Sequence, residues 1–526
     1  MTAEKSNPGQ NEDIKEMQAY YAILNYGCQM NESDAEHYAG QLEELGYART
    51  EDLFQAGVIV VNTCCVRESA ELRILGKIGE LKNVKAHHPG QIICVAGCMA
   101  QKDGAALVKK YPQIDLLLGT SYVNSFKKIL QDYLEERRRG VFTSLEVQSS
   151  EFEGHRVRES GFSAWIPIMY GCNNFCTYCI VPYVRGRERS RSIENILEEV
   201  RAAVANGYKE ITLLGQNVDS YGKDFLRKHE EDKLLSVSSA VGEGFTEALK
   251  AEPFAALLKA VDQVPGVERV HFMTSHPRDI SEEVIKTVAS GTHLCEHFHI
   301  ALQSGSNRIL TAMNRGYTRE HFIELVRTIR RYIPQASITT DIIVGFPGET
   351  EEDFAETCRL VEEVGFDSAF TFIYSKRSGT PAARMENQVP DEVKHARLQK
   401  LMDVQNRQSL CINQRLVGKT VEVMAEGPTE KHPEIWSGRT RGNRLVLWQQ
   451  NVEGPGMNCV TKKREHLTGD TDEDNKPVKT VEITDRVNKS AEVTGEGSNL
   501  AVLPGQLVKI RIESAQTWLV KGTRIK

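Results

Sequence analysis

Three cysteines that lie close together in the sequence carry the clearest signal for chemistry. Cys172, Cys176 and Cys179 are spaced Cys-x-x-x-Cys-x-x-Cys and directly follow an apolar, strand-like run at residues 165–170. Cysteine thiolates are the ligands of iron–sulfur cubanes. A cubane with three protein ligands leaves one iron open to a small molecule, just as catalytic zinc keeps one open position. The spacing therefore indicates a reactive centre rather than a structural one.

Two other uses of these thiols compete with a cluster. A structural zinc site usually has a second pair of Cys or His ligands, and no such pair follows at suitable spacing. A disulfide framework is typical of small secreted domains, whereas this chain has 526 residues and opens with polar residues instead of an apolar signal segment. We expect the thiols to lie in a reducing cytoplasm.

A second set of cysteines is spread over the first hundred residues. Cys28, Cys64 and Cys98 each stand at or just beyond the end of a predicted strand. A parallel sheet would bring all three to one edge, where α/β proteins usually bind ligands. The alternative is that scattered cysteines are small buried hydrophobic residues, which is our interpretation of Cys94. A Ser-x-x-Glu pair at residues 33–36 predicts a capping box at the start of a helix.

Strands that alternate with helices predict an α/β fold in two units, followed by a small all-β unit. The first unit is expected to be a Rossmann-like parallel domain. The second has six strand–helix units, which fit a partial TIM-like barrel with its active site at the carboxyl ends of the strands and an open side for a bulky substrate. Its strands are predicted near residues 164–170, 210–215, 269–274, 297–302, 337–345 and 368–375.

Composition changes along the chain suggest the domain boundaries. We predict a disordered tail at 1–18, an N-terminal domain at 19–138, a polar linker within 140–155, the partial barrel at 158–390, a helical connector at 391–414 and a β-barrel at 415–526. Two polar stretches interrupt this plan. Residues 222–253 are predicted to be a surface loop, and residues 451–499 a long insertion.

The overall composition gives no sign of a membrane protein or of a generally basic surface. Hydrophobic residues make up 40% of the chain, and no apolar run is long enough to span a bilayer. The net charge is -7, so contact with RNA would have to come from local basic patches. One candidate patch follows the cysteine loop and contains Arg185, Arg187, Arg189 and Arg191.

A second candidate patch combines basic and aromatic residues near the end of the chain. Such residues on a small barrel suit phosphate pairing and base stacking, although a charged run is more often simply a solvated face. The residues in question are Arg439, Arg441, Arg444, Lys509, Arg511 and Lys521, with Trp436, Trp448 and Trp518.

The three-cysteine pattern, with Tyr178 before its last cysteine, resembles the signature of the radical S-adenosylmethionine (SAM) superfamily. Residues 27–31, 62–64 and 97–101, placed ahead of residues 171–191, resemble its methylthiotransferase family. The resemblance implies two 4Fe–4S clusters and SAM as cofactors. The cluster on Cys172, Cys176 and Cys179 would be catalytic and make a radical from SAM. The second, on Cys28, Cys64 and Cys98, would carry the sulfur; the resemblance selects Cys64 rather than Cys65.

Further motifs at residues 213–222, 299–306, 313–318 and 341–350 resemble the branch of this family that thiomethylates C2 of a prenylated adenosine beside the tRNA anticodon. The resemblance implies a tRNA partner that carries this adenosine, a reductant such as flavodoxin or ferredoxin, and a terminal RNA-binding TRAM module. It makes the backbone of Tyr178 an adenine contact. Gln216, Gln303 and Asp341 are candidate SAM contacts near strand ends, or ordinary polar residues at a barrel mouth.

Other functions remain open at this point. Relatives within the family act on threonylcarbamoyl-adenosine in tRNA or on an aspartate of a ribosomal protein. A non-catalytic RNA-binding iron–sulfur protein would come from a different functional class. We expect a cytoplasmic monomer without a membrane segment.

Overall fold

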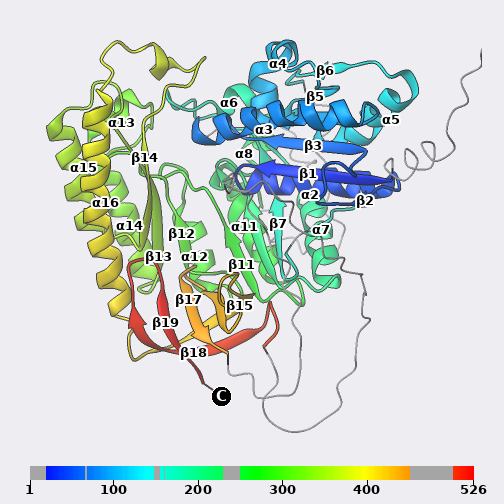
Figure 1. The fold of residues 1–526 in the computed structure, drawn as a ribbon. Coiled ribbons are helices and arrows are strands. Elements are labelled where there is room, and N and C mark those ends of the chain that lie inside the picture. Colours follow the sequence, from blue (N-terminus) through cyan, green and yellow to red (C-terminus); the bar gives the residue numbers. More distant parts are fainter. Residues whose placement is uncertain are drawn as a thin grey trace, which may run out of the picture.

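The fold is taken from a computed structural model that describes residues 19–65, 68–146, 154–158, 160–228, 249–450 and 502–525. It contains an N-terminal α/β domain, a central partial barrel and a C-terminal β-barrel (Figure 1). The tail predicted at 1–18 and the insertion predicted at 451–499 lie outside the described residues, as do residues 229–248 of the predicted loop.

The N-terminal domain is built on a parallel sheet with strand order β2-β1-β3-β4-β5-β6. Its central strands, β3 (Val58–Thr63) and β4 (Ile92–Gly97), are buried along their whole length, as is typical of parallel strands covered on both faces. The outer strands are β1 (Tyr20–Tyr26), β2 (Ala48–Arg49), β5 (Leu116–Leu118) and β6 (Gly140–Phe142). The Rossmann-like prediction is confirmed.

Helices cover both faces of this sheet and form a separate apolar core on each. One face packs against α2 (Gln29–Glu44) and α5 (Phe126–Glu136). The other packs against α3 (Glu68–His87) and α4 (Cys98–Lys110). The carboxyl edge of the sheet is therefore left as the place where loops can gather polar or metal-binding groups.

The central domain contains the six predicted strands in chain order. They are β7 (Ser163–Pro167), β10 (Glu210–Leu214), β11 (Arg269–Phe272), β12 (His297–His299), β13 (Ser337–Val344) and β14 (Ser368–Ile373). They form two three-stranded parallel sheets, which isolated bridges between residues 270 and 294 and between 275 and 300 join into one curved wall. Within the described residues β7 and β14 do not pair, so the barrel is open on one side.

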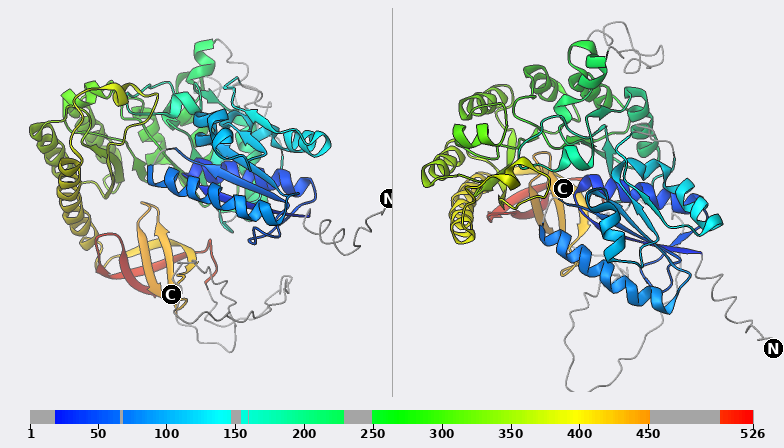
Figure 2. Two further views of the ribbon diagram at one scale, coloured as in Figure 1. Left: turned by 45° about the horizontal axis from the view of Figure 1, so that its top comes forward. Right: turned by 90° about the horizontal axis from the view of Figure 1, so that it is seen from above.

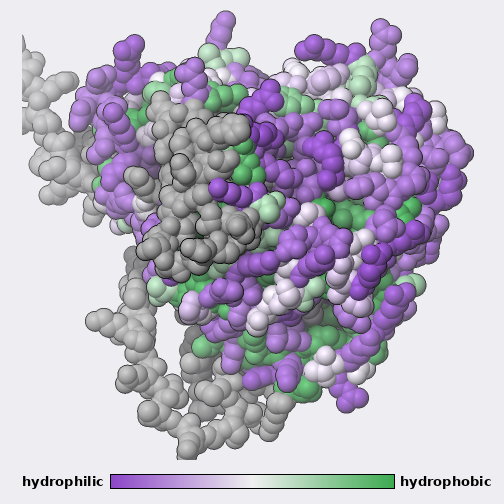
Figure 3. All heavy atoms as spheres, turned by 180° about the vertical axis from the view of Figure 1, so that it is seen from behind, coloured by the Kyte–Doolittle hydropathy of each residue, from purple (hydrophilic) through white to green (hydrophobic). Residues whose placement is uncertain are grey.

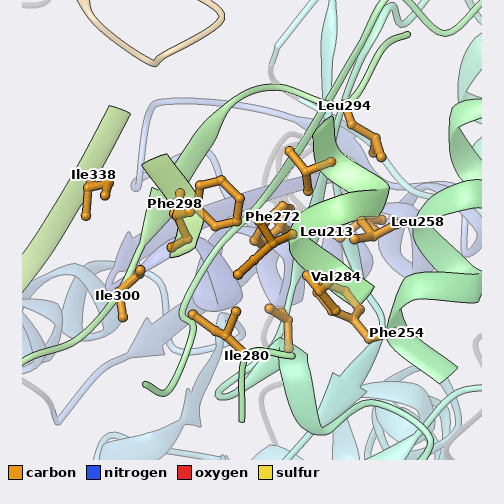
Figure 4. Packing of buried hydrophobic residues seen from close by; sticks show 14 of the residues in the cluster. Leu213, Phe254, Leu258, Phe272, Ile280, Val284, Leu294, Phe298, Ile300 and Ile338 are labelled. Carbon is orange, nitrogen blue, oxygen red and sulfur yellow. The ribbon is translucent and has the colours of Figure 1, made fainter. Parts of the chain in front are cut away.

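The outer face of this wall is a continuous apolar core. Phe272 stands between Phe254 and Phe298 in edge-to-face contacts, with Leu213 and Val284 packed close by (Figure 4). The helices that cover this face are α7 (Ile193–Ala205), α11 (Pro253–Asp262), α12 (Glu282–Ser290), α14 (Arg319–Tyr332) and α15 (Glu351–Val364). Shorter elements connect them: α6 (Val181–Val184), α8 (Lys223–Lys228), α13 (Asn307–Ala312), β8 (Met169–Tyr170) and β9 (Arg189–Ser190).

The inner face of the wall is polar. Alternation along the strands turns Thr212, His271, His299 and Thr339 inward, while their neighbours join the outer core. A closed TIM barrel normally fills this space with branched apolar side chains. The interior of this barrel therefore remains hollow and able to hold a polar ligand.

The C-terminal domain follows α16 (Asp391–Gln414), a long helix that runs along one side of the partial barrel (Figures 1 and 2). It is a closed barrel of β15 (Thr420–Pro428), β16 (Ile435–Thr440), β17 (Leu445–Gln449), β18 (Leu507–Ala515) and β19 (Val520–Ile525). This small barrel is the architecture predicted for the terminal domain.

Arginines attach the C-terminal barrel to the central domain at the amino ends of its strands. Arg441 Nε donates to Glu296 Oε2 at 2.9 Å, and Arg444 pairs with Asp367. Arg269 Nη1, from β11, donates to the Arg439 carbonyl at 2.6 Å. These contacts make the C-terminal barrel a floor beneath the hollow.

Three details of the sequence predictions are wrong. The capping box at residues 33–36 lies inside α2, which begins at Gln29. β6 pairs with β5, so the N-terminal sheet extends beyond the boundary predicted at residue 138 and into the predicted linker. The region predicted as a surface loop at 222–253 begins with α8, where Asp224 is buried and accepts hydrogen bonds from Ser190.

Hydrophilic side chains predominate over the coloured part of the rear face, and hydrophobic ones are scattered among them (Figure 3). Among the helices of the described residues, none combines the length and apolar character needed to cross a membrane.

Candidate active site between two groups of cysteines

The sheet of the N-terminal domain brings three distant cysteines to one edge. Cys28 follows β1 and precedes α2, Cys64 follows β3, and Cys98 follows β4 as the first residue of α4. These strands are neighbours in the sheet. We call these three residues the auxiliary group. Their convergence agrees with the sequence prediction.

Asparagines in the same motifs tie the cysteine loops together. Asn31 Nδ2 donates to the Thr63 carbonyl at 3.1 Å, and Asn62 Nδ2 donates to the Asn31 carbonyl at 2.6 Å. Asn31 Oδ1 also accepts from the Cys28 thiol at 3.4 Å. Asn31 and Asn62 belong to the motifs at residues 27–31 and 62–64, but the sequence alone does not predict these hydrogen bonds.

The surroundings of the auxiliary group favour thiolates, the form that binds metal. A hydrogen bond from Cys64 lowers the pKa of Cys28 to about 6, and the positive charge of Arg185 also lowers it, against the effect of burial. A hydrogen bond from Cys65 lowers the pKa of Cys98 to about 7, and Arg185 again contributes. The same Cys98 contact, together with burial, raises the pKa of Cys65.

The second group of cysteines lies on the loop that follows β7 and β8. We call Cys172, Cys176 and Cys179 the loop group. Burial raises the pKa of Cys172 to about 11 and of Cys179 to about 12, and the charge of neighbouring Cys176 adds to both shifts. These thiols are therefore close enough to influence one another electrostatically.

A buried arginine donates a hydrogen bond to one cysteine of the loop group. Arg315 Nη1 donates to Cys176 Sγ at 3.3 Å, while its Nη2 donates to the Ala301 carbonyl at 2.6 Å. Thr177 fixes the loop by donating from its backbone and side chain to Met313 and Ala312. Arg315 belongs to the motif at residues 313–318, but nothing in its spacing predicts this contact.

Both groups offer the ligand type that iron–sulfur clusters require. No three His, Cys, Asp or Glu side chains in the described part of the chain converge tightly enough to hold a single metal ion. A cubane requires a different geometry, because each thiolate binds a different iron. The cysteine sulfurs must therefore stand further apart than they would around a single metal ion. The donor chemistry of both groups therefore fits a cluster.

The two groups meet at one place between the domains. Cys65 and Cys98 pack with Ile180 and Val184, which directly follow the loop group in sequence. A cavity of about 1210 Å³ is lined by Cys65 from one side and Cys179 from the other. Cys65 is the neighbour of Cys64 and not a member of the auxiliary group, so the contact between the two groups is made by Cys98 through Ile180 and Val184.

Comparisons with known proteins agree with this geometry. The family model described as the radical SAM superfamily matches residues 166–361, and that of the uncharacterized protein family UPF0004 matches residues 20–119. A "tRNA-2-methylthio-N(6)-dimethylallyladenosine synthase" from Desulforamulus reducens is 48% identical over 453 residues, which cover 85% of this chain and 94% of that protein. A protein of the same name from Desulfitobacterium hafniense is 49% identical over 81% of this chain and 90% of its own length.

The chain belongs to the radical-SAM methylthiotransferase family. Its members are enzymes that use an iron–sulfur cluster and SAM. Solved structures are more distant: the radical SAM methyltransferase TsrM from Kitasatospora setae has a TM-score of 0.45 at 14% identity, covering 70% of this chain and 74% of that one.

Three of the four candidate SAM contacts of this methylthiotransferase line the cavity beside Cys179. They are Tyr178, Gln303 and Asp341. Oε1 of Gln303 is buried without a hydrogen-bond partner, and so is Oε1 of Gln216, the fourth candidate. Buried polar atoms in native proteins are normally paired, so both amides fit a site that takes a polar ligand such as SAM.

A second cavity occupies the lower half of the barrel. It measures about 790 Å³ and lies above the C-terminal barrel, which contributes Arg439, Arg444 and Trp518 to its lining. Phe370 on β14 and Trp165 on β7, the two strands that border the open side, also line it. Phe370 and Trp518 are 51% and 57% exposed, which is unusual for aromatic side chains.

The predicted RNA contacts fall into two classes. Arg185 is buried and bound to Asp34 at 2.8 Å, so the prediction of an RNA contact does not hold for it. Arg441 and Arg444 are engaged in docking the C-terminal barrel, and Trp436 packs against Trp448.

The second class remains available to a ligand. Arg187 is exposed and stacks on Phe175 with 4.2 Å between guanidinium and ring centre, and Arg189 is half-buried. The side chain of Arg439 is 44% exposed and pairs with Glu426.

Proposed function

We propose that this methylthiotransferase sulfurates and methylates C2 of N6-dimethylallyladenosine next to the anticodon of tRNA. The supporting observation is that Cys98 of the auxiliary group packs with Ile180 and Val184, which directly follow the loop group, in a chain whose relatives at 48–49% identity bear the corresponding name. We assign one 4Fe–4S cluster to the loop group and a second to the auxiliary group. When bound, the clusters and SAM supply the carbon-centred radical, the sulfur and the methyl group.

The protein's own residues hold and shield this chemistry. The cysteines bind the metal, Arg315 and the Asn31–Asn62 pair fix their loops, and the amides of Gln216 and Gln303 offer unpaired acceptors to SAM. Apolar contacts around Ile180 and Val184 exclude water where the two groups meet. Water exclusion protects a reactive intermediate from side reactions.

The lower cavity offers space for the N6 substituent of a modified adenosine. On an adenine ring, C2 and the N6 substituent point in different directions. If C2 faces the cysteines, the N6 substituent is directed away from them, and the hollow below offers apolar walls from Trp165, Met273 and Phe370. Such walls suit a five-carbon prenyl group, whereas Arg439 and Arg444 in the same lining offer the paired charge that a threonylcarbamoyl carboxylate requires. The choice of the prenyl substrate therefore rests on the names of the relatives.

The open side and the C-terminal barrel suit an RNA loop. Exposed Trp518 and Phe370 provide faces for base stacking, and Arg187 and Arg439 provide phosphate contacts. The partners in this proposal are tRNA and a reductant such as flavodoxin or ferredoxin. The place of action is the cytoplasm, with a monomer as the working unit.

Nucleoside mass spectrometry tests the proposal. A strain that lacks the protein should lose the 2-methylthio group from dimethylallyladenosine in its tRNA and accumulate the unthiolated nucleoside. Unchanged levels, or loss of 2-methylthio-threonylcarbamoyl-adenosine instead, would reject the assignment. Anaerobically reconstituted protein should also form 5′-deoxyadenosine from SAM and reductant, which a non-catalytic RNA-binding protein would not do.

A further inference from the structure

One short segment physically connects the two cysteine groups. Residues 180–185 directly follow Cys179, form the single turn α6 and end at Arg185 against the N-terminal domain. The Val184 carbonyl accepts a hydrogen bond from Thr120, and Val184 itself packs on Cys65 and Cys98. We call residues 180–185 the interdomain segment. Its far end therefore reaches the auxiliary group.

Arg185 carries a full charge into this interior. Its side chain is 5% exposed, and its Nη2 donates to Oδ2 of Asp34, itself 6% exposed, at 2.8 Å. Asp34 lies on α2, the helix that begins directly after Cys28. Burial lowers the pKa of Arg185, but the negative charges of Cys98, Asp34 and Cys28 outweigh this effect and raise it. The guanidinium therefore acts on two auxiliary thiols and one carboxylate at once.

Stability alone is a weak explanation for such a pair. Two charges lose their hydration when buried, and an apolar pair of similar size is often as stable. Nor does RNA explain the arginine, because its guanidinium lies in the interior. A cluster bound through thiolates would bring further negative charge to this place, and its potential responds to net charge and to hydrogen bonds on its sulfurs. A fixed cation beside it favours the reduced, more negative state.

We propose that Arg185, held by Asp34, sets the reduction potential of the cluster bound by Cys28, Cys64 and Cys98. This proposal rests on the two-cluster function argued above. Arg185 raises the potential, and Asp34 limits the increase by offsetting part of the charge. Arg185 lies at the end of the interdomain segment, which begins directly after Cys179. The reduction potential of the auxiliary cluster therefore depends on correct docking of the central domain, which carries the loop group.

The experiment uses the full chain with Cys172, Cys176 and Cys179 replaced by Ala, so that only the auxiliary cluster forms. After anaerobic reconstitution with iron and sulfide, the midpoint potential is measured by a redox titration followed by electron paramagnetic resonance. In this background Arg185→Gln should shift the potential to a more negative value. Asp34→Asn should shift it the opposite way, and Arg185→Lys, which keeps the charge, should stay close to the parent.

Arg187→Gln is the matched control, because Arg187 carries the same charge two residues further on but is exposed and stacks on Phe175. It should leave the potential unchanged. If the Arg185→Gln variant fails to take up iron, the direction of the shift in midpoint potential in Asp34→Asn still tests the proposal. Equal shifts in the same direction from Arg185→Gln and Asp34→Asn, or no shift from either, would overturn the proposal. If the triple-alanine parent itself binds no cluster, the two-cluster function fails, and this inference fails with it.

Discussion

At the residue scale, local charges and hydrogen bonds prepare the auxiliary thiols to bind metal. Cys28 precedes α2 and Cys98 begins α4, so both stand at helix amino ends, where the helix dipole favours an anion. Arg185 adds a full positive charge to the same place. A cysteine in such surroundings reacts as a thiolate well below the pH at which an ordinary thiol does.

This leads to a pH-dependent prediction for the cluster-free protein. The pKa of Cys28 is lowered to about 6, so its thiolate predominates above that pH and disappears below it. Alkylation of Cys28 by iodoacetamide should reach half its maximal rate near pH 6. Peptide mass spectrometry over a pH series would measure it, with exposed Cys411 as the reference for an accessible thiol and buried Cys94 as the unreactive one. A Cys28 rate that rises only above pH 8 would contradict the prediction.

At the scale of single elements, the turn from β4 into α4 places Cys98. Gly97 has a φ of +95°, and a Cβ there would stand 2.4 Å from the carbonyl oxygen of Thr63, the last residue of β3 and the neighbour of Cys64. Gly97→Ala combines an unfavourable backbone conformation with this clash, so we expect the free energy of unfolding to fall by about 2 kcal/mol or more. Urea unfolding of the anaerobic protein would measure the loss.

The same substitution should also affect metal binding. Iron content after reconstitution should fall to about half, because only the auxiliary group is displaced. Gly90→Ala is the control, since a Cβ at Gly90 meets nothing within 4 Å. It should change stability by less than about 0.5 kcal/mol and leave the iron content intact. Full iron with Gly97→Ala would mean that Cys98 is not a ligand.

Sequence patterns were sufficient to predict a strand or helix where the element's own residues define it. The apolar runs of β3 and β4 revealed strands, and parallel pairing then required Cys28, Cys64 and Cys98 to meet. α16 occupies the residues for which a helical connector was predicted.

Local sequence patterns could not predict contacts between elements that are distant in the sequence. The Ser-x-x-Glu pair predicted a helix start, yet Arg156, from far along the chain, binds Ser33 inside α2, and Glu36 is buried there. Likewise, Arg185 belongs to a run of alternating arginines that resembles a solvated face. Its role emerged only when Asp34 was placed beside it. Arg315 was missed for the same reason.

At the scale of the whole molecule, the C-terminal barrel is part of the active-site enclosure. Arg441 binds Glu296 and the carbonyls of Thr292 and Leu294, and Arg444 binds Asp367. All of these partners lie at the amino ends of strands β12 and β14, beneath the lower cavity. The domain proposed to bind RNA therefore also closes the space proposed for the prenyl group.

This dual role predicts that docking and RNA binding can be separated. Replacing Arg441 and Arg444 together by Ala removes charge-assisted hydrogen bonds worth about 2 kcal/mol each, so the barrel should detach. Small-angle X-ray scattering should then show a larger radius of gyration. RNA affinity should change little, because exposed Arg439 and Trp518 remain on the barrel. In contrast, tRNA thiomethylation should fall at least tenfold, since the substrate is no longer positioned.

Lys521→Ala, on β19, is the control and should leave the radius of gyration unchanged. Unaltered thiomethylation by a detached barrel would show that the lower cavity does not require its floor.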